Sequence, residues 1–467
     1  MGRTLPILSQ NEDFVRRIGA GWSAGPRAPR VPEGLASSAA AHRETLSQQF
    51  LGTALVVFAG EAMLRNDDNN FLFRADSDFL WLTGCPAEGA VLVMTPRSGG
   101  HDAVLYIPEP ITAGSPSFLE SRNHSELWVG PSPDLRGWAD ALGVEVRSLH
   151  SAEPGLGTSL RAVPVQAAGR LAGPLAATTS FSGALAQTIS EMRLIKDAWE
   201  IGQLREAVDA SVGGFNAVAA ELEQSIEFGG ERWLQGTFDR HARTLGNGVG
   251  YGSIVAAGSH APVLHWTRSD GPVLPNHLVL LDAGVETNSF YSADVTRTFP
   301  AGGTFSAEQR AVHDLVQASH EAGLAAVGPG RQFTDFHFAA MEVIAQGLHD
   351  WGMLPVSVDE ALTDSGQHHR RYLICGIGHH LGLDVHDCSR ARHEHYHAAA
   401  MEPGMVITVE PGLYFHENDE TVPPELRGIG VRIEDDIVVT ETGSEVLSAA
   451  LPIDATGLEQ WVAQQRR

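Results

Sequence analysis

The sequence predicts a smaller α/β domain followed by a larger α+β domain. Short apolar and β-branched runs, separated by turn residues, fill the first part of the chain. From about residue 186 they give way to long stretches with helical period. Strand-like runs then return with helical stretches between them, which is typical of a largely antiparallel sheet with helices packed on one side. The 467 residues are enough for two domains with sizeable cores.

The first domain is predicted to span residues 1–185. Residues 23–41 are rich in Pro, Ala, Gly and Ser, so we expect an irregular segment there. Farther along, TALVVFAG, GAVLVMTP and HDAVLYIP have the length and composition of strands, and PDLRGWADALG has a helical pattern. Strands interspersed with a helix predict an α/β domain.

The second domain is predicted to span residues 186–467. Apolar residues at spacings of three and four predict an amphipathic helix over residues 192–210. Helices are also expected at about 307–327 and 333–351. The predicted strands lie in HLVLLDAGVE, FYSADVTRTFP, MVITVEPGLYF and VRIEDDIVVTETG.

The composition argues against several classes of partner. With 32 basic and 57 acidic residues the net charge is −25, so we expect neither nucleic acid nor an anionic membrane surface as a partner. No apolar run approaches the roughly 20 residues that span a bilayer. The amino terminus lacks the pattern of a secretory signal, and three cysteines are too few for a disulfide framework. These features predict a cytoplasmic protein.

Four carboxylates interrupt runs that otherwise look buried. Asp282 ends one predicted strand and Asp294 lies in the next, so a β-hairpin would bring them together. Glu410 and Glu434 flank a second connection between strands in the same way. A solvent-facing sheet edge would also explain one such acid, but it explains four in apolar contexts poorly.

The neighbours of these acids on the same strand face are polar as well. Residues two apart share a face, which pairs Thr296 with Asp294, Thr408 with Glu410 and Arg432 with Glu434. Four carboxylates in one apolar pocket cannot all stay ionised, because burial and like charges both raise carboxyl pKa values. Two divalent cations would balance four negative charges.

One histidine typically completes such an oxygen-rich ligand set. His379 and His386 lie in the glycine-punctuated stretch GIGHHLGLDVHD, where one can bind metal and the other can face substrate. Oxygen-dominated ligation with a single imidazole favours Mn(II), with Co(II) or Zn(II) as other possible occupants.

With these residues in place, the sequence resembles the metallopeptidases of the pita-bread fold, and most closely aminopeptidase P. The stretch RNDDNNFLFRADSDFLWLTGCPAEGAVLVM resembles the first domain of that family. The resemblance implies a curved antiparallel sheet with helices on one side, preceded by an α/β creatinase-like domain. It rests on motifs in the family's order across residues 260–443: HAPVLHWT, LLDAGVETNSFYSADVTRTFPAGGTFSAEQR, GIGHHLGLDVHD, MEPGMVITVEPGLY and RGIGVRIEDDIVVTETG.

The resemblance also implies which side chains would bind two divalent metal ions. Asp294 and Glu434 would bridge both ions. Asp282 would chelate one of them, and His379 with Glu410 would bind the other. All five residue types are present at the matching positions.

Further residues would support the substrate and the ligands. His265 and His386 match the family's substrate histidines, and Arg432 matches an arginine that would orient the acidic ligands together with Thr296. Cys375, four residues before His379, stands where aminopeptidase P commonly has a histidine near the substrate.

A second departure concerns the spacing of two ligands. Asp282 and Asp294 are one residue farther apart than the family leads us to expect, so a longer turn or a bulge is predicted between them.

The predicted reaction is release of the N-terminal residue from peptides with proline in the second position. Glu410 is the candidate proton acceptor and shuttle, His386 the candidate donor to the developing oxyanion, and His265 would help to hold the peptide. An X-Pro bond is a tertiary amide without an N–H, which requires a dedicated pocket. Members of the family that the sequence resembles often form dimers or tetramers, so the resemblance implies a homodimer or homotetramer.

Two other functions remain open from the sequence. A prolidase would cleave Xaa-Pro dipeptides and would need a cation for the terminal carboxylate, for which Arg390 and Arg392 are candidates. A metal-free binding module is the alternative from another class, although such modules lack the complete ligand set.

Overall fold

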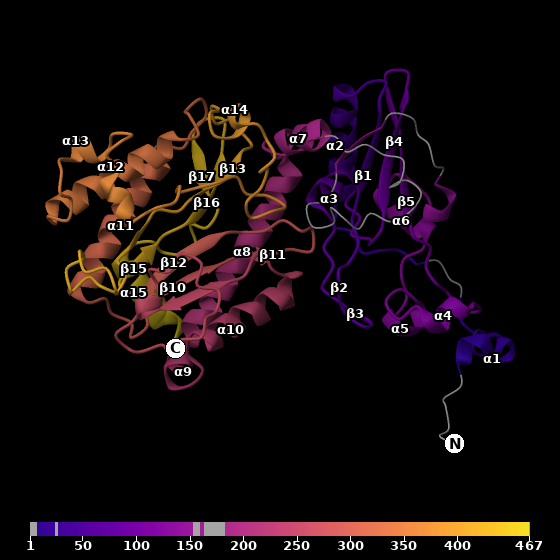
Figure 1. Cartoon of the computed structure of the whole chain (residues 1–467), viewed down its shortest axis with the longest axis horizontal. Coiled ribbons are helices and arrows are strands. Elements are labelled where there is room, and N and C mark those ends of the chain that lie inside the picture. The colour runs from indigo at the N-terminus through magenta and orange to yellow at the C-terminus, as the bar shows by residue number, and fades with distance from the viewer. Residues whose placement is uncertain (1–6, 24–26, 153–158, 163–182, 467) are drawn as a thin grey trace. The chain divides into compact units, whose positions relative to one another are not determined.

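The computed structural model describes residues 7–23, 27–152, 159–162 and 183–466. The chain divides into two compact units, residues 1–189 and 190–467. Figure 1 labels the helices and strands of both units. Each unit has its own sheets and its own helices.

The amino-terminal unit is built on a five-stranded mixed sheet with the order β6-β5-β4-β1-β7. The pairs β1/β4 and β4/β5 are antiparallel, whereas β1/β7 and β5/β6 are parallel. The sheet and a small hairpin comprise β1 (Ala54–Phe58), β2 (Leu64–Asn66), β3 (Asn69–Asn70), β4 (Val91–Arg97), β5 (Gly100–Ile107), β6 (Glu145–Ser148) and β7 (Ser159–Ala162).

Three helices of the amino-terminal unit, α1, α3 and α6, begin at a side-chain cap. Asp134 accepts a hydrogen bond of 2.7 Å from the Gly137 amide at the start of α6, and Gly143 ends that helix at a φ of 60°. The helices are α1 (Glu12–Ile18), α2 (Leu35–Gln49), α3 (Ser77–Thr83), α4 (Pro116–Glu120), α5 (Glu126–Val129) and α6 (Leu135–Leu142).

The expectation of an irregular segment over residues 23–41 is wrong for its second half. Helix α2 begins at Leu35 and takes in the run LASSAAA. Alanine has the highest helix propensity, and Leu35 and Ala39 are buried, so packing and propensity outweigh the small polar residues of this run.

Two helix pairs flank the strands of the carboxy-terminal unit in Figure 1, α8 with α10 and α11 with α12. Both α8 and α11 start with a capping box, formed by Asp197 with Glu200 and by Ser306 with Gln309. Helix α7 (Gly183–Met192) includes the boundary between the two units. The helices that follow are α8 (Ala198–Ala220), α9 (Leu222–Glu227), α10 (Gly230–Leu245), α11 (Ala307–Ala325), α12 (Asp335–Asp350), α13 (Val358–Ala361), α14 (His393–Tyr396) and α15 (Ala455–Gln465).

All strand pairs of this unit are antiparallel, as the sequence predicts. The sheets have the orders β12-β10-β9, β11-β8, β13-β16-β17 and β14-β15. The strands are β8 (Gly248–Val249), β9 (Ile254–Ala257), β10 (Leu278–Ala283), β11 (Val285–Glu286), β12 (Val295–Pro300), β13 (Val406–Val409), β14 (Gly412–Tyr414), β15 (Gly430–Arg432), β16 (Asp435–Val439) and β17 (Ser444–Val446).

The connection between β10 and β12 is a longer turn rather than a tight hairpin. The chain continues through β11 and turns at residues 287–291, where Phe290 has a φ of 71°. A Cβ on Gly284 would lie 1.6 Å from the Ala293 carbonyl oxygen, so the two arms approach as closely as only glycine permits. The longer turn accommodates the additional residue between Asp282 and Asp294, and β10 and β12 remain paired along their length.

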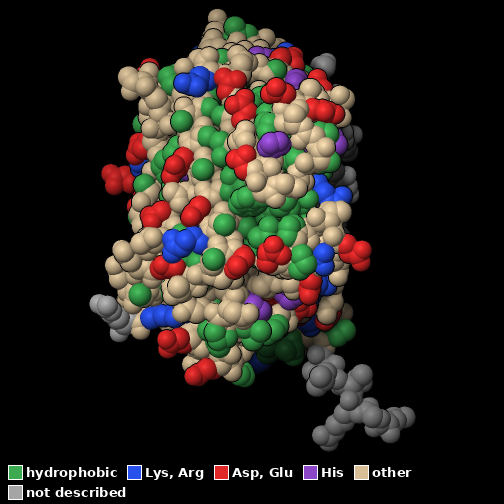
Figure 2. All heavy atoms as spheres, turned by 90° about the vertical axis from the view of Figure 1, so that its left-hand side faces the viewer, with side chains coloured by type: hydrophobic (Ala, Val, Ile, Leu, Met, Phe, Trp, Pro, Cys, Tyr) green, Lys and Arg blue, Asp and Glu red, His purple; other side chains and the backbone are tan. Residues whose placement is uncertain are grey.

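The surface of the protein reflects its acidic composition. Figure 2 shows a group of hydrophobic side chains on one face, with Asp and Glu side chains spread around it. Among the described residues, no helix combines the length and the apolar character that a bilayer crossing requires.

Replacing Gly284 by alanine should destabilise the protein, because the added methyl group collides with backbone. We expect a loss of roughly 3 kcal/mol in the free energy of unfolding. Gly236, exposed in α10 with open space around it, is the matched control. Gly236→Ala should gain up to about 1 kcal/mol from helix propensity. Thermal melts of both variants measure the difference, and equal melting temperatures would contradict the close approach.

Candidate metal centre

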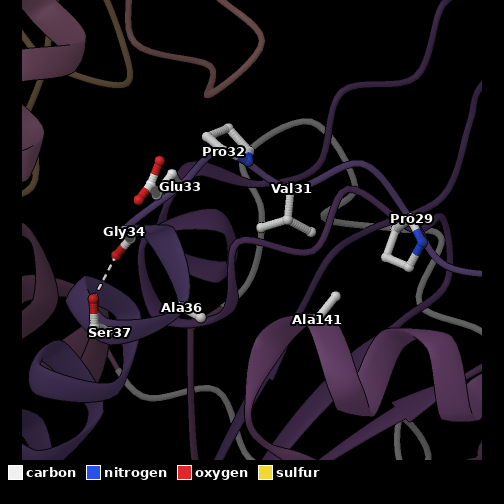
Figure 3. Close-up of a pocket in the computed structure, with 8 residues that line it drawn as sticks. All are labelled: Pro29, Val31, Pro32, Glu33, Gly34, Ala36, Ser37 and Ala141. Atoms are coloured by element: carbon white, nitrogen blue, oxygen red, sulfur yellow. Dashed lines mark hydrogen bonds between the residues drawn. The ribbon is translucent and has the colours of Figure 1, made fainter.

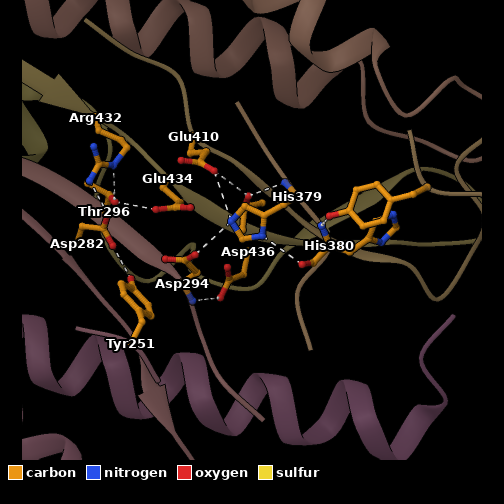
Figure 4. Close-up of polar contacts among 12 residues, drawn as sticks. Tyr251, Asp282, Asp294, Thr296, His379, His380, Glu410, Arg432, Glu434 and Asp436 are labelled. Atoms are coloured by element: carbon orange, nitrogen blue, oxygen red, sulfur yellow. Dashed lines mark hydrogen bonds and ion pairs between the residues drawn. The ribbon is translucent and has the colours of Figure 1, made fainter. Parts of the chain in front are cut away.

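Two antiparallel strand pairs bring the four predicted carboxylates together. Asp282 lies in β10 and Asp294 directly precedes β12, its antiparallel partner. Glu410 directly follows β13 and Glu434 directly precedes β16, which also pair. Backbone hydrogen bonds between Thr296 and Glu434, of 3.1 and 3.4 Å, join the two strand pairs. In Figure 4 the four carboxylates point toward a common space.

The His379 imidazole reaches the same space. Its Nε2 atom is 3.3 Å from Asp294 Oδ2 and 3.5 Å from Glu410 Oε1. Its Nδ1 atom lies 3.1 Å from the carbonyl oxygen of His380, to which the Nδ1–H donates. Ligand atoms of Asp294, His379 and Glu434 all lie within 4.8 Å of one another, a spacing that can hold a metal ion.

Three polar side chains fix the orientation of the acids. Tyr251 donates a hydrogen bond of 2.5 Å to Asp282 Oδ1, and the Arg432 guanidinium is hydrogen-bonded to Asp282 Oδ2. Thr296 donates to Glu434 Oε2 at 2.7 Å and accepts from Arg432 Nε at 3.2 Å. Asp282 and Glu434 are therefore held in place by protein contacts, which lowers the cost of forming a metal site.

Burial and the charges of neighbouring acids raise the pKa values of three of the carboxylates, Asp282, Glu410 and Glu434. Asp282, Asp294 and Glu434 are at most 7% exposed. Burial, reinforced by the charge of Asp294, raises the pKa of Glu410 to about 7 and that of Glu434 well above its ordinary value. The pKa of Asp282 is raised for the same reasons, although Arg432 opposes the shift.

His379 responds to the same excess of negative charge. Burial opposes its protonation, but the hydrogen bond to Asp294 and the charge of Glu410 raise its pKa to about 9. Negative charge exceeds positive charge in this cluster, and this excess favours the protonated forms of His379 and Glu410. Divalent cations would supply that charge, and oxygen-rich ligands with one imidazole are chemically suited to them.

The predicted substrate residues border this cluster. The ring centroids of His386 and His379 are 4.3 Å apart, and both His386 and His265 are exposed. Partial burial of the ring, together with the positive charges of His379 and His265, lowers the pKa of His386, which indicates that the three imidazoles lie near one another. Burial and the charge of Glu410 raise the pKa of the Cys375 thiol, so this residue also borders the acids.

Sequence reasoning missed a buried charge cluster next to His386. Arg193 is hydrogen-bonded to Asp387 and lies 3.3 Å from Asp384, and Lys196 Nζ is 3.4 Å from Asp387. These contacts join the start of the unit to the segment that carries His386. The only sequence signal for this cluster is the basic pair Arg193 and Lys196 in MRLIKD, and nothing in the sequence indicates that Asp387 is their partner.

Tyr251 and Asp436 were also missed. Asp436 is fully buried, and its Oδ2 atom accepts a hydrogen bond of 3.1 Å from the backbone amide of Asp294. The sequence assigns no partner to either residue, because both lie far along the chain from the acids that they contact. For Asp436 the run EDD offered a weak signal.

One candidate for a carboxylate-binding cation is already engaged. The Arg392 guanidinium makes two hydrogen bonds, of 2.6 and 2.9 Å, to Glu191. This pairing weakens the case for Arg392 as the cation that a prolidase would need.

A pocket in the amino-terminal unit has different chemistry. It has a volume of about 410 Å³, and among its lining residues Glu33 is the ionisable one. Figure 3 shows the pocket, in which Ser37 donates a hydrogen bond of 2.8 Å to the carbonyl oxygen of Gly34. None of the predicted site residues lines this pocket, whose walls are Pro29, Val31, Pro32, Glu33, Gly34, Ala36, Ser37 and Ala141.

Comparison with protein families matches both units. Residues 202–441 match metallopeptidase family M24, and residues 39–163 match the aminopeptidase P N-terminal domain. The first match contains all five predicted metal ligands.

Relatives resemble the chain over nearly its whole length. Xaa-Pro aminopeptidase 2 of Streptomyces coelicolor is 46% identical over 463 residues, which cover 98% of this chain and 97% of the relative. Xaa-Pro aminopeptidase of Escherichia coli is 32% identical over 434 residues, covering 88% and 93%.

Solved structures share the fold. Pseudomonas aeruginosa aminopeptidase PepP superposes with a TM-score of 0.80 at 31% identity, covering 94% of this chain and 99% of that one. Escherichia coli aminopeptidase P in complex with substrate gives a TM-score of 0.79 at 29% identity, covering 93% and 100%.

Cation binding should release protons, and more of them at low pH. Ligands bind metal in their deprotonated forms, so Glu410 must lose a proton below about pH 7 and His379 below about pH 9. Affinity should therefore fall as the pH falls, with about one more proton released per chain at pH 6 than at pH 8.

Calorimetric titration of chelator-treated protein with Mn(II), in buffers of different ionisation enthalpy, counts these protons. Glu410→Gln is the control, because it removes the carboxyl group that titrates near pH 7. Equal proton release at both pH values in the unmodified chain would contradict the electrostatic account of the cluster.

Proposed function

The chain belongs to metallopeptidase family M24 and carries the aminopeptidase P N-terminal domain, so we propose that it is a metal-dependent hydrolase that releases the N-terminal residue from peptides with proline in the second position. The observation that carries this proposal is that four carboxylates, in or next to the two strand pairs of a pita-bread domain, converge with the imidazole of His379, which lies outside those strands. Such a site is suited to hydrolysis of an amide that lacks an N–H.

We assign five side chains as metal ligands. Asp294 and Glu434 would bridge two divalent ions, with Asp282 on one of them and His379 and Glu410 on the other. The oxygen-rich set favours Mn(II), with Co(II) or Zn(II) as alternatives. When bound, the ions supply Lewis-acid charge and lower the pKa of water.

Glu410 is the proposed proton carrier. Its pKa, raised by burial to about 7 in the metal-free chain, shows how strongly its surroundings favour a proton on the carboxyl group. In the reaction Glu410 accepts a proton from the attacking water and delivers it to the proline nitrogen as the C–N bond breaks. Thr408, whose hydroxyl lies 3.5 Å from Glu410 Oε1, helps to orient the carboxylate.

The imidazoles at the border of the cluster would handle the substrate. A burial-lowered pKa keeps His386 neutral near pH 7, so one ring nitrogen can donate a hydrogen bond to the carbonyl oxygen as it becomes an oxyanion. His265 would hold the peptide, and the Cys375 side chain would line the same pocket. Arg432 and Thr296 keep the acids in place.

A prolidase is the alternative within the same chemistry. The pairing of Arg392 with Glu191 provides one observation against it. We further propose a homodimer or homotetramer as the working form, by analogy with the family that the sequence resembles, and a cytoplasmic location, which the low cysteine count favours.

Substrate length separates the two reactions. The Mn-loaded protein should cleave Xaa-Pro-Xaa peptides at the first bond at least 10-fold more efficiently than Xaa-Pro dipeptides, measured as kcat/KM by chromatography of the products. Glu410→Ala should abolish turnover while its circular dichroism spectrum stays unchanged. Cleavage confined to dipeptides would make the protein a prolidase, and no cleavage by the metal-loaded chain would overturn the proposal.

A further inference from the structure

A buried carboxylate outside the acidic cluster holds a long loop in place. Glu231, the second residue of α10, is fully buried and accepts four hydrogen bonds. Its Oε1 atom accepts from the Ala257 amide at 2.7 Å and faces His260 Nδ1 at 2.8 Å. Its Oε2 atom accepts from Trp266 Nε1 at 2.8 Å and from the Gly271 amide at 2.7 Å. Both oxygens are therefore fully engaged.

The four donors enclose the segment that carries His265. Ala257 ends β9 and Gly271 lies at the far end of the loop, so one carboxylate ties both ends together. Trp266, the residue next to His265, is the anchor in between. His265 itself is exposed, and its carbonyl oxygen accepts a hydrogen bond of 2.9 Å from the Thr267 amide.

Packing around the carboxylate leaves the loop little freedom. The Trp266 indole stacks on the His260 ring at 3.8 Å, and the Arg268 guanidinium lies 4.1 Å from the centre of the indole ring. A Cβ on Gly271 would lie 2.3 Å from the His260 ring. Arg232, the next residue of α10, donates a hydrogen bond of 2.8 Å to the carbonyl oxygen of Arg268.

We propose that Glu231 is a positioning residue, which acts through the 257–271 loop to set the place of His265 at the substrate side of the metal centre. This inference rests on the proposed function, in which His265 holds the peptide. A buried carboxylate stays in a protein at a high desolvation cost unless it is saturated with hydrogen bonds. Here every donor comes from the loop or its ends, so the carboxylate stabilises the loop conformation.

Glu231→Gln tests the role with little change in shape. An amide has one acceptor oxygen, and its NH₂ group faces either Ala257 or Gly271, whichever way it turns. At least one backbone N–H then meets another donor and loses its acceptor. The loop should shift, and KM for an Xaa-Pro-Xaa peptide should rise about 10-fold with a smaller change in kcat.

Hydrogen exchange gives a readout that does not depend on activity. Amides in residues 257–271 should exchange faster in Glu231→Gln, while those of α11 stay as protected as in the unmodified chain. Glu221→Gln is the matched control, since Glu221 accepts from Trp233, Thr237 and Arg240 of α10 and bonds to no part of the loop in the described contacts. In Glu221→Gln, the KM for the peptide and the rate of amide hydrogen exchange in residues 257–271 should equal those of the unmodified chain.

A double-mutant cycle separates positioning from general destabilisation. If Glu231 acts through His265, Glu231→Gln should raise KM little further in a His265→Ala background. Trp266→Phe, which removes one donor and keeps the aromatic stack, should raise KM in the same direction by a smaller factor. This variant decides the question if Glu231→Gln fails to fold.

Several outcomes would overturn the inference. Additive effects in the cycle, loop exchange equal to that of the unmodified chain, or an unchanged KM in Trp266→Phe would each do so. An absence of Xaa-Pro cleavage by the unmodified chain would instead refute the proposed function, while the exchange data would still report whether Glu231 holds the loop.

Discussion

Repulsion among the carboxylates of Asp282, Asp294, Glu410 and Glu434 dominates the electrostatics of the carboxy-terminal unit. Burial raises the pKa values of Asp282, Glu410 and Glu434, and Arg432 offsets only part of the charge. The fold can maintain such a cluster because two antiparallel strand pairs fix the backbones of the acids, and hydroxyl groups fix the side chains of Asp282 and Glu434. The electrostatic cost that remains is what divalent cations would relieve.

The surroundings of the cluster repeat one pattern, in which a buried ion holds a segment that carries an exposed histidine. Glu231 ties down the loop of His265, and Asp387 ties the segment of His386 to Arg193 and Lys196. Histidines on otherwise irregular backbone gain fixed positions in this way.

Local patterns in the sequence predicted the antiparallel strands, the helices near 307–327 and 333–351, and the four acids, because strand parity and helical period depend on near neighbours. The partners of the acids were harder to predict. Arg432, 150 residues from Asp282, was expected beside the acids only through the family resemblance, and Tyr251, 31 residues from Asp282, was not expected there. Helix α2 was missed because its run of Ala and Ser resembles a loop in composition.

Anomalous diffraction at the manganese edge from crystals grown with Mn(II) would locate bound metal in the cluster. We expect two peaks per chain between the carboxylates, with Asp294 and Glu434 in contact with both and His379 in contact with one. A map without peaks at these acids, or with its peaks at other residues, would contradict the view that the cluster exists to hold metal.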